Sequence, residues 1–204
     1  MIKNISNIIE PNYSSWQTIE LSYQFARQMI DEGIEGDFVE CGVACGNNLA
    51  AMCLAGRHGY GFDSFEGIPW AGKNDTEQPG IGEINKSKIG VLESSGVTVH
   101  GIEDVKKNFE RWGLKNYTLI EGWFENTIPI HQDFKISVLR LDGDLYESTL
   151  IPLKYLYPLL SKGGILIIDD WNLKGCRDAF YNYFSLDNVP TEIMQEGNPK
   201  YFKK

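Results

Sequence analysis

The sequence predicts an α/β fold in which helices cover both faces of a mostly parallel sheet. Short apolar runs, rich in β-branched and aromatic residues, alternate with segments of helical periodicity, as in parallel strands joined by helices. Several runs end in acidic residues or lead into glycines, which is typical of strands whose carboxyl ends face a ligand site. A chain of 204 residues is long enough for one ordinary core and short for two, so we expect residues 1–204 to form a single domain.

Five segments have the composition of buried strands. Each is short and largely apolar, and turn residues or helical segments bound it. The predicted strands are DFVEC (37–41), GYGFD (59–63), YTLIE (117–121), ISVLRL (136–141) and GILIID (164–169). Their alternation with helices indicates a doubly wound, Rossmann-like sheet, in which ligands bind beyond the carboxyl ends of the strands.

Helical periodicity occupies much of the sequence before and between these strands. We expect an N-terminal helix at about 14–33, because apolar residues recur there on one helical face. The residues expected to point inward are Trp16, Ile19, Tyr23, Ala26 and Ile30. Further helices are expected in NLAAMCLAG (48–56), EDVKKNFERWG (103–113) and TLIPLKYLYPLLSKGG (149–164), all of which finish in Gly, a common helix terminator.

One long segment, residues 66–98, has no regular periodicity. It combines Gly, Pro and charges of both signs, a composition that cannot fill a core. Loops of this length inside a compact domain are usually functional. We expect an insertion that is mobile without ligand and closes as a lid over the ligand site.

The charge and hydropathy of the chain limit the partners and the cellular location that we expect for it. A net charge of −9 and a pI near 4.9 disfavour nucleic acid or an anionic membrane surface as a partner. No apolar run approaches the roughly 20 residues that span a bilayer, and the N-terminus lacks a secretory apolar core, so we expect a cytoplasmic protein. Cys41, Cys45, Cys53 and Cys176 fit reduced thiols there. The sequence leaves open whether the chain forms a homo-oligomer.

A glycine loop, ECGVACGNN (40–48), follows the first predicted strand. Gly42 and Gly46 let the backbone turn tightly and approach a ligand before the next helix begins, although a simple turn is the alternative. The loop carries no cation and lies beside Glu40, which disfavours pyrophosphate and suits a cationic ligand group such as a sulfonium. Asn48, at the helix start, is expected to reach a ligand carboxylate.

Asp63 ends the second predicted strand, 21 residues beyond Gly42. An acid at this distance can accept both hydroxyls of a nucleoside ribose, and its neighbour Ser64 is included in the same site. The alternative is that Asp63 caps a turn in FDSFEG. After the third strand, Trp123 or Phe124 could flank an adenine, the alternative being an ordinary core position. Together with the cation-free loop, Asp63 favours S-adenosylmethionine over NAD or ATP.

Acidic pairs end the fourth and fifth predicted strands. Asp142 and Asp144 lie in LRLDGDLYEST, and Asp169 and Asp170 lie in GGILIIDDW. If the two strands are neighbours, their ends lie about 4.8 Å apart, so Asp142 and the Asp169–Asp170 pair can share one cation. An oxygen-only ligand set suits Mg2+ or Mn2+, and Asp144 can accept a proton in the same site. The alternative is that these acids cap helices or face solvent.

Five blocks of the sequence resemble one family over about residues 13–184. GDFVECGVACGNN, GFDSFEGIP, IEGWFENTIP, VLRLDGDLYEST and GGILIIDDW follow one another as in the macrocin O-methyltransferase (TylF-type) family of class I S-adenosylmethionine-dependent methyltransferases. The resemblance implies Mg2+-dependent methyl transfer to a sugar hydroxyl, typically on a glycosylated natural product. It also places metal ligands on Asp142, Asp169 and Asp170, the general base on Asp144, and Asp142 within the cofactor site.

Four functions compete on this evidence. They are a sugar O-methyltransferase, a catechol-type O-methyltransferase, whose glycine loop is similar, a nucleotide-binding dehydrogenase and a non-catalytic S-adenosylmethionine-binding partner protein. Hydride transfer gives three clustered acids no role, and a binding-only protein has no need of all four. Residues 66–98, where acceptor specificity is expected to reside, match the family only in DSFEGIP, so the sequence leaves the acceptor undetermined.

Overall fold

A seven-stranded sheet forms the centre of the protein. The computed structural model describes residues 5–75, 87–185, 188–193 and 197–204. The strand order is β3-β2-β1-β4-β5-β7-β6, with β1 to β5 parallel and β7 antiparallel to both of its neighbours. The strands are β1 (Asp37–Cys41), β2 (Gly59–Asp63), β3 (Tyr117–Glu121), β4 (Ile136–Leu141), β5 (Leu160–Ile168), β6 (Thr191–Glu192) and β7 (Lys200–Lys203). The five predicted strands are confirmed, and the C-terminal pair β6 and β7 was not predicted.

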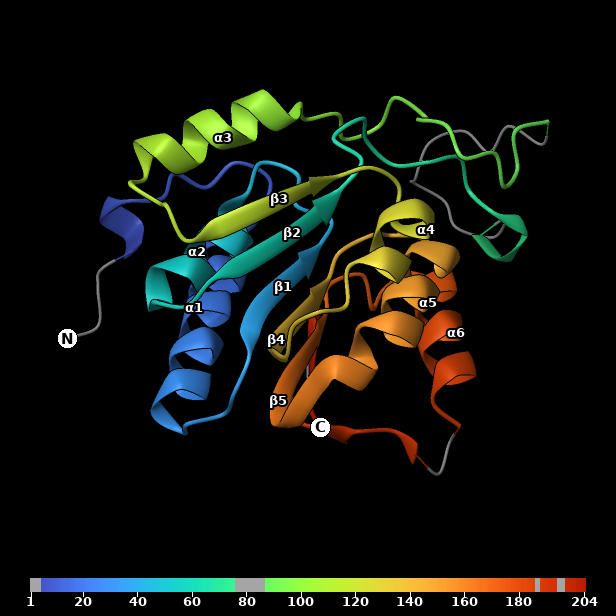
Figure 1. Cartoon of the computed structure of the whole chain (residues 1–204). Helices are drawn as coiled ribbons and strands as arrows, with labels where there is room; N and C mark the ends of the chain where they lie inside the picture. Colours follow the sequence, from blue (N-terminus) through green and yellow to red (C-terminus); the bar gives the residue numbers. More distant parts are fainter. Residues whose placement is uncertain (1–4, 76–86, 186–187, 194–196) are drawn as a thin grey trace.

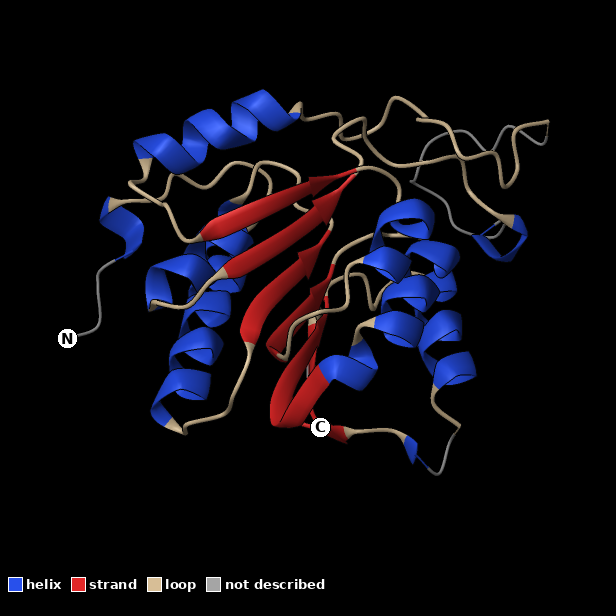
Figure 2. Cartoon of the chain, in the orientation of Figure 1, coloured by secondary structure: helices blue, strands red, loops and turns tan. Residues whose placement is uncertain are grey.

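Helices cover both faces of this sheet, as Figures 1 and 2 show. One face carries α1 (Trp16–Asp31), α2 (Asn47–Ala55) and α3 (Ile102–Arg111), and the other carries α4 (Phe124–Thr127), α5 (Tyr146–Tyr155) and α6 (Lys174–Tyr183). Short 3-10 turns occur at η1 (Ile5–Asn7), η2 (Lys73–Asp75), η3 (Ile128–Ile130) and η4 (Tyr157–Leu159). The predicted α/β fold with a doubly wound sheet is therefore confirmed.

Side-chain alternation along β4 divides the core between the two faces. Val138 packs in the cluster beneath α1 to α3, whereas Leu139 and Leu141 pack in the cluster beneath α5 and α6. Because successive strand residues point to opposite faces, Arg140 lies on the same face as Val138. A charged residue is thus placed on a fully buried row of the sheet, where it requires partners.

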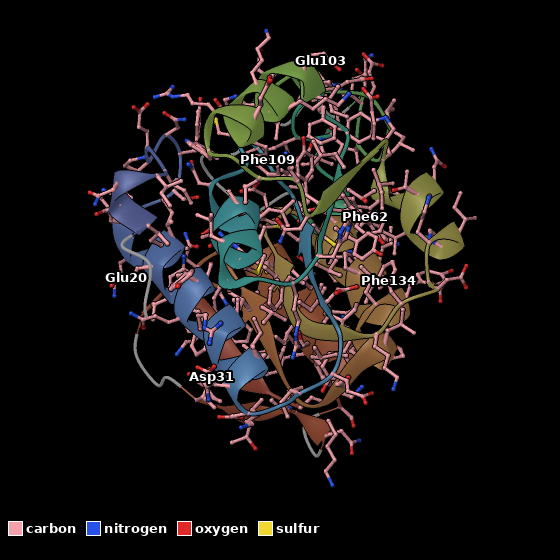
Figure 3. The ribbon with its side chains drawn as sticks, turned by 60° about the vertical axis from the view of Figure 1, so that its left-hand side comes forward. Glu20, Asp31, Phe62, Glu103, Phe109 and Phe134 are labelled. Carbon is pink, nitrogen blue, oxygen red and sulfur yellow. The ribbon has the colours of Figure 1, made fainter. Side chains whose placement is uncertain are left out.

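The amphipathic helix α3 closes one edge of the core. Figure 3 shows Phe109 pointing inward beneath α3, while Glu103 on the same helix points outward. Phe109 is fully buried and its ring lies 4.6 Å from that of Tyr117 in β3, edge to face. This packing holds α3 over the start of α2, next to the glycine loop.

Two details of the predicted helices are wrong. Trp16, expected to point inward, is 37% exposed at the first residue of α1 and lies outside the packed core. The segment 149–164 is not one helix: α5 ends at Tyr155, and β5 already begins at Leu160. Pro158 explains the break, because proline lacks a backbone N–H and disfavours a helical residue before it.

The described flanks of segment 66–98 pair with each other. Pro69 and Ser94 form an antiparallel bridge, and Ile68 N donates to Val97 O at 2.9 Å. Residues 76–86 lie outside the described residues, so the expected closure of this segment as a lid stays a prediction. Within the described part of the chain, no helix combines the length and apolar character needed to cross a membrane.

A buried carboxylate anchors this segment to the start of α5. Asp75, 1% exposed, accepts hydrogen bonds from Tyr146 N at 2.9 Å and from Gly72 N at 3.1 Å. Burial raises the pKa of the Asp75 carboxyl, and the two N–H donors lower it. Asp75 therefore pairs an N–H group in the first turn of α5 that no helical carbonyl can reach.

Asp75→Ala should lower the free energy of unfolding by about 1–3 kcal/mol, because the buried N–H of Tyr146 and the partly buried N–H of Gly72 lose their acceptor. Urea denaturation measures this change. Asp31→Ala is the control: Asp31 is exposed and pairs with Arg27 on the surface, and its loss should cost less than about 0.5 kcal/mol. Equal stability of the two variants would contradict the anchoring role of Asp75.

Candidate active site

A cavity of about 340 Å3 opens beyond the carboxyl ends of the parallel strands. It lies where the strand order reverses, because β1 has β2 on one side and β4 on the other. The loops after β1 to β5 and the first turn of α1 all contribute to its wall. The predicted residues that line it are Gly42, Asn48, Asp63, Ser64, Trp123, Phe124, Asp142, Asp144, Asp169 and Asp170.

Gly42 brings the loop after β1 against the end of β4. Its φ is +90°, and a Cβ built there would lie 1.8 Å from the carbonyl oxygen of Asp142. Gly46, at φ +88°, lies behind the cavity wall, where a Cβ would lie 2.3 Å from Cε1 of Phe109. Both glycines make the tight turn that the sequence predicts, and only glycine fits either place.

Asp63 holds the glycine loop in position. Its Oδ2 accepts from Val43 N at 2.7 Å and Ala44 N at 3.0 Å, and its Oδ1 accepts from Phe65 N at 2.7 Å. The turn-capping alternative is thus present in the structure. Asp63 lines the cavity, and its remaining acceptor capacity lies on Oδ1, because Oδ2 already accepts two hydrogen bonds. Ribose binding by Asp63 stays a prediction.

Asn48 joins the N-terminal segment to the cavity. Its Nδ2 donates to Ser14 Oγ at 2.7 Å, and its Oδ1 accepts from Ser22 Oγ at 3.1 Å. The side-chain amide is therefore engaged within the protein, and its expected contact with a ligand carboxylate stays a prediction. Sequence reasoning missed four lining residues that this segment supplies: Tyr13, Ser14, Ser15 and Thr18.

Two aromatic residues after β3 border the same cavity. Trp123 precedes the first residue of α4, and Phe124 begins that helix. Both are half-buried, and Cε2 of Phe124 lies 3.2 Å from a Cβ built on Gly143. Phe124 is thus packed against the loop after β4, while contact of either residue with an adenine stays a prediction.

The acids after β4 and β5 lie together because hydrogen bonds of the sheet continue one residue beyond the strands. Asp142 N donates to Cys41 O at 2.8 Å, and Asp169 N donates to Leu141 O at 2.9 Å. One carboxylate oxygen each from Asp142, Asp169 and Asp170 lies within 4.8 Å of the others. The expected convergence is confirmed, and the all-oxygen donor set fits a hard divalent cation.

Asp144 is held in a left-handed conformation, at φ +61°, beside these acids. Its backbone N donates to Asp170 Oδ2 at 2.8 Å. Burial and the charge of Asp169 raise the pKa of Asp144 to about 6. The same two causes raise the pKa of Asp142 well above its usual range, and burial with the charge of Asp144 does so for Asp170. A bound cation would relieve this repulsion.

Arg140 is the charged residue that sequence reasoning left without a role. Its side chain is 1% exposed and contacts Glu40, Asp142 and Asp169. Glu40 lies behind the cavity wall, where burial raises its pKa to about 8 although Arg140 lowers it. The signal was an arginine inside the apolar run ISVLRL, because a buried charge requires buried partners.

Comparison with known proteins identifies the family. The model of the macrocin-O-methyltransferase (TylF) family matches residues 19–204. The chain belongs to the macrocin O-methyltransferase family. This confirms the resemblance that the five sequence blocks indicate.

Three relatives support the macrocin O-methyltransferase assignment. The chain is 37% identical over 164 residues to the 8-demethyl-8-(2,3-dimethoxy-alpha-L-rhamnosyl)-tetracenomycin-C 4'-O-methyltransferase of Streptomyces olivaceus, covering 76% of this chain and 60% of the relative. It is 32% identical to the mycinamicin III 3''-O-methyltransferase of Micromonospora griseorubida, covering 80% and 66%. The demethyldecarbamoylnovobiocin O-methyltransferase of Streptomyces niveus is also 32% identical, with 84% and 66% covered. The chain thus spans 60–66% of the length of these relatives.

Two solved structures share the fold. The O-methyltransferase NovP superposes with a TM-score of 0.74 at 30% identity, over 91% of this chain and 78% of that chain. The calicheamicin methyltransferase CalS11 superposes with a TM-score of 0.75 at 21% identity, over 98% and 82%. These similarities confirm the class I methyltransferase fold for the macrocin O-methyltransferase family member described here.

Gly42→Ala should lower the free energy of unfolding by at least about 3 kcal/mol, because the added Cβ strains the backbone and collides with Asp142 O. Thermal and urea denaturation measure the change. Gly113→Ala is the matched control, since Gly113 also has a positive φ, +71°, but a Cβ there meets no atom within 4 Å. It should show only the conformational cost, about 1 kcal/mol. Similar losses in both variants would contradict the close approach.

Proposed function

We propose that this protein transfers the methyl group of S-adenosylmethionine to a hydroxyl of a sugar or glycosylated natural product, with Mg2+ or Mn2+ required. One observation carries the proposal: three carboxylates from adjacent strand ends converge in the cavity that the glycine loop borders. The names of the three relatives, all O-methyltransferases acting on natural products, support the acceptor class. Residues 1–204 are proposed to form one methyltransferase domain that acts in the cytoplasm.

The loops after β1, β2 and β3 are proposed to bind S-adenosylmethionine. Gly42 opens space beside the backbone, and Asp63 presents a carboxylate for the ribose. Ser64, Trp123 and Phe124 complete the wall expected to enclose the nucleoside. Asp142 lies between this region and the other acids. It is therefore proposed to face both the methionine end of S-adenosylmethionine and the cation. Glu40, Gly46 and Asn48 support this region from behind or from the side.

The acids after β4 and β5 are proposed to carry the chemistry. Asp142, Asp169 and Asp170 would hold a divalent cation, whose Lewis acidity when bound makes an acceptor hydroxyl easier to deprotonate. Asp144 is proposed to take that proton, because its backbone N–H bonded to Asp170 keeps it beside the cation ligands. The cavity walls then orient the acceptor oxygen.

The lining of the cavity favours a sugar over a catechol as acceptor. Polar side chains predominate, including those of Ser14, Ser15, Thr18, Thr98 and Ser148. Among the described residues, the wall contains no Met. A planar acceptor would be matched by an aromatic and Met-rich wall. The catechol-type reaction is therefore the second candidate.

Segment 66–98 is proposed to select the acceptor. From its described flanks, Gly67, Ile68, Pro69 and Thr98 line the cavity. Asp75 anchors the same segment to the start of α5, two residues beyond Asp144. Changes in this segment would thus reach both the acceptor and the position of the general base.

S-adenosylhomocysteine should bind in calorimetry without added metal, whereas NAD and ATP should not compete. Asp63→Ala should weaken this binding by about 1–3 kcal/mol. Because Asp63 also holds the loop, a 2′-deoxyribose analogue separates the two effects: the analogue should lose affinity for the wild type but little further affinity for Asp63→Ala. An equal loss for both proteins would show that Asp63 acts on the loop alone.

Substitutions of the acids should separate cation ligands from the base. Asp142→Asn and Asp169→Asn should weaken Mg2+ binding, and excess Mg2+ should restore part of the activity toward a panel of glycosides. Asp144→Asn should keep the affinities for Mg2+ and for the cofactor, since Asn also tolerates a left-handed backbone. It should lower the rate about 10²–10⁴-fold, because the proposed base is lost. Excess Mg2+ should not rescue it. Full wild-type activity in EDTA would contradict the metal requirement.

A further inference from the structure

One buried guanidinium connects the cofactor half of the site to the acid cluster. Arg140 Nη2 donates to Asp142 Oδ2 at 2.9 Å and to Asp169 Oδ1 at 2.6 Å. Its Nε lies 3.1 Å from Oε1 of Glu40. Glu40 is paired with Arg140 in the register of β1 and β4, and both side chains are 1% exposed.

We propose that Arg140 is a positioning residue that fixes Asp142 and Asp169 for cation binding. This inference rests on the proposed cation site. The guanidinium takes one oxygen from each carboxylate and leaves the other oxygen of each for the cation. Ligating carboxylates whose orientation is set by hydrogen bonds bind a metal more tightly, because less rotational freedom is lost on binding.

The shape of the guanidinium is essential to this role. The two hydrogens of Nη2 reach the carboxylates that follow β4 and β5, while Nε lies beside Glu40 in β1. Arginine presents these donors in a fixed plane, whereas a lysine ammonium is a single point on a flexible chain. Glu40 contacts Arg140 from the side of β1 as an ion pair without hydrogen-bond geometry, and its charge opposes the attraction of the two aspartates for the guanidinium.

The balance of charge explains why Arg140 does not replace the cation. One positive charge lies among Glu40, Asp142, Asp169 and Asp170, which carry four negative charges when ionised. Because the guanidinium is buried below the cluster, Asp142 and Asp169 keep 27% and 24% of their side-chain surface exposed. Their exposed sides face the cavity, where a divalent cation would complement the remaining charge.

Arg140→Lys tests the proposal, with Mn2+ binding as a readout that does not depend on activity. Electron paramagnetic resonance of free Mn2+ should show that the variant binds Mn2+ about 10–100-fold more weakly than the wild type does. Thermal denaturation and S-adenosylhomocysteine binding establish that the variant is folded. A purely structural role for Arg140 would lower the melting temperature and leave the Mn2+ affinity of the folded protein unchanged, which would overturn the proposal.

Arg57→Lys is the matched control. Arg57 is a partly buried arginine, and its guanidinium donates to Gly36 O at 2.9 Å and to Ser137 Oγ at 3.3 Å, near the opposite end of β4. The same chemical change there should leave Mn2+ affinity as in the wild type. An equal loss of Mn2+ affinity in both variants would overturn the specific role of Arg140.

Glu40→Gln supplies a second test that does not alter Arg140. Glu40 is not among the candidate cation ligands, so a loss of Mn2+ affinity of at least about three-fold that is absent in the Arg140→Lys background passes through Arg140. In the Arg140→Lys background, Glu40→Gln should add little. If Arg140→Lys does not fold, Glu40→Gln decides alone, and unchanged Mn2+ affinity overturns the proposal. A wild type that binds no Mn2+ overturns the cation site itself, whereas wild-type binding that Arg140→Lys leaves intact overturns only the role of Arg140.

Discussion

The close approach of Gly42 to the carbonyl of Asp142 is the constraint on which the geometry of the site depends. With no Cβ at Gly42, the loop after β1 passes directly over the end of β4, and the cofactor region borders the acid cluster without an intervening side chain. Asp63 then secures the loop through two of its backbone N–H groups. One glycine therefore decides whether the two halves of the site share a cavity.

Charge is the second constraint. The carboxyl ends of β1, β4 and β5, with the loops after them, bring carboxylates together at one edge of the sheet, and burial makes their ionised forms costly. Arg140 compensates part of that charge from within the sheet, and a divalent cation in the cavity would compensate more. A protein that needed only to fold would not gather these acids, which is why their convergence indicates function.

Much of the fold could be predicted because β1, β4 and the second half of β5 are buried on both faces. The five parallel strands form short apolar runs, and their boundaries follow from the turn residues and charges beside them. β6 and β7 escaped prediction because TE and KYFK are short and mostly polar. Only the pairing of β7 with β5, and of β6 with β7, defines them as strands. The prediction of one helix over 149–164 was wrong because helices and buried strands share the same apolar pattern. Pro158 restricts the backbone locally, and the helix ends before it.

The sequence by itself determined the family, the class of ligand and the identity of the acids, because each follows from residue types at fixed places after predicted strands. Only the tertiary structure decided what these residues contact. In the structure, Asp63 accepts hydrogen bonds from the glycine loop, and Asn48 bonds to Ser14 and Ser22. Arg140 lies between Glu40 and the acids. The physical reason is that side-chain partners across a sheet come from strands far apart in the chain, so their pairing depends on strand order and register.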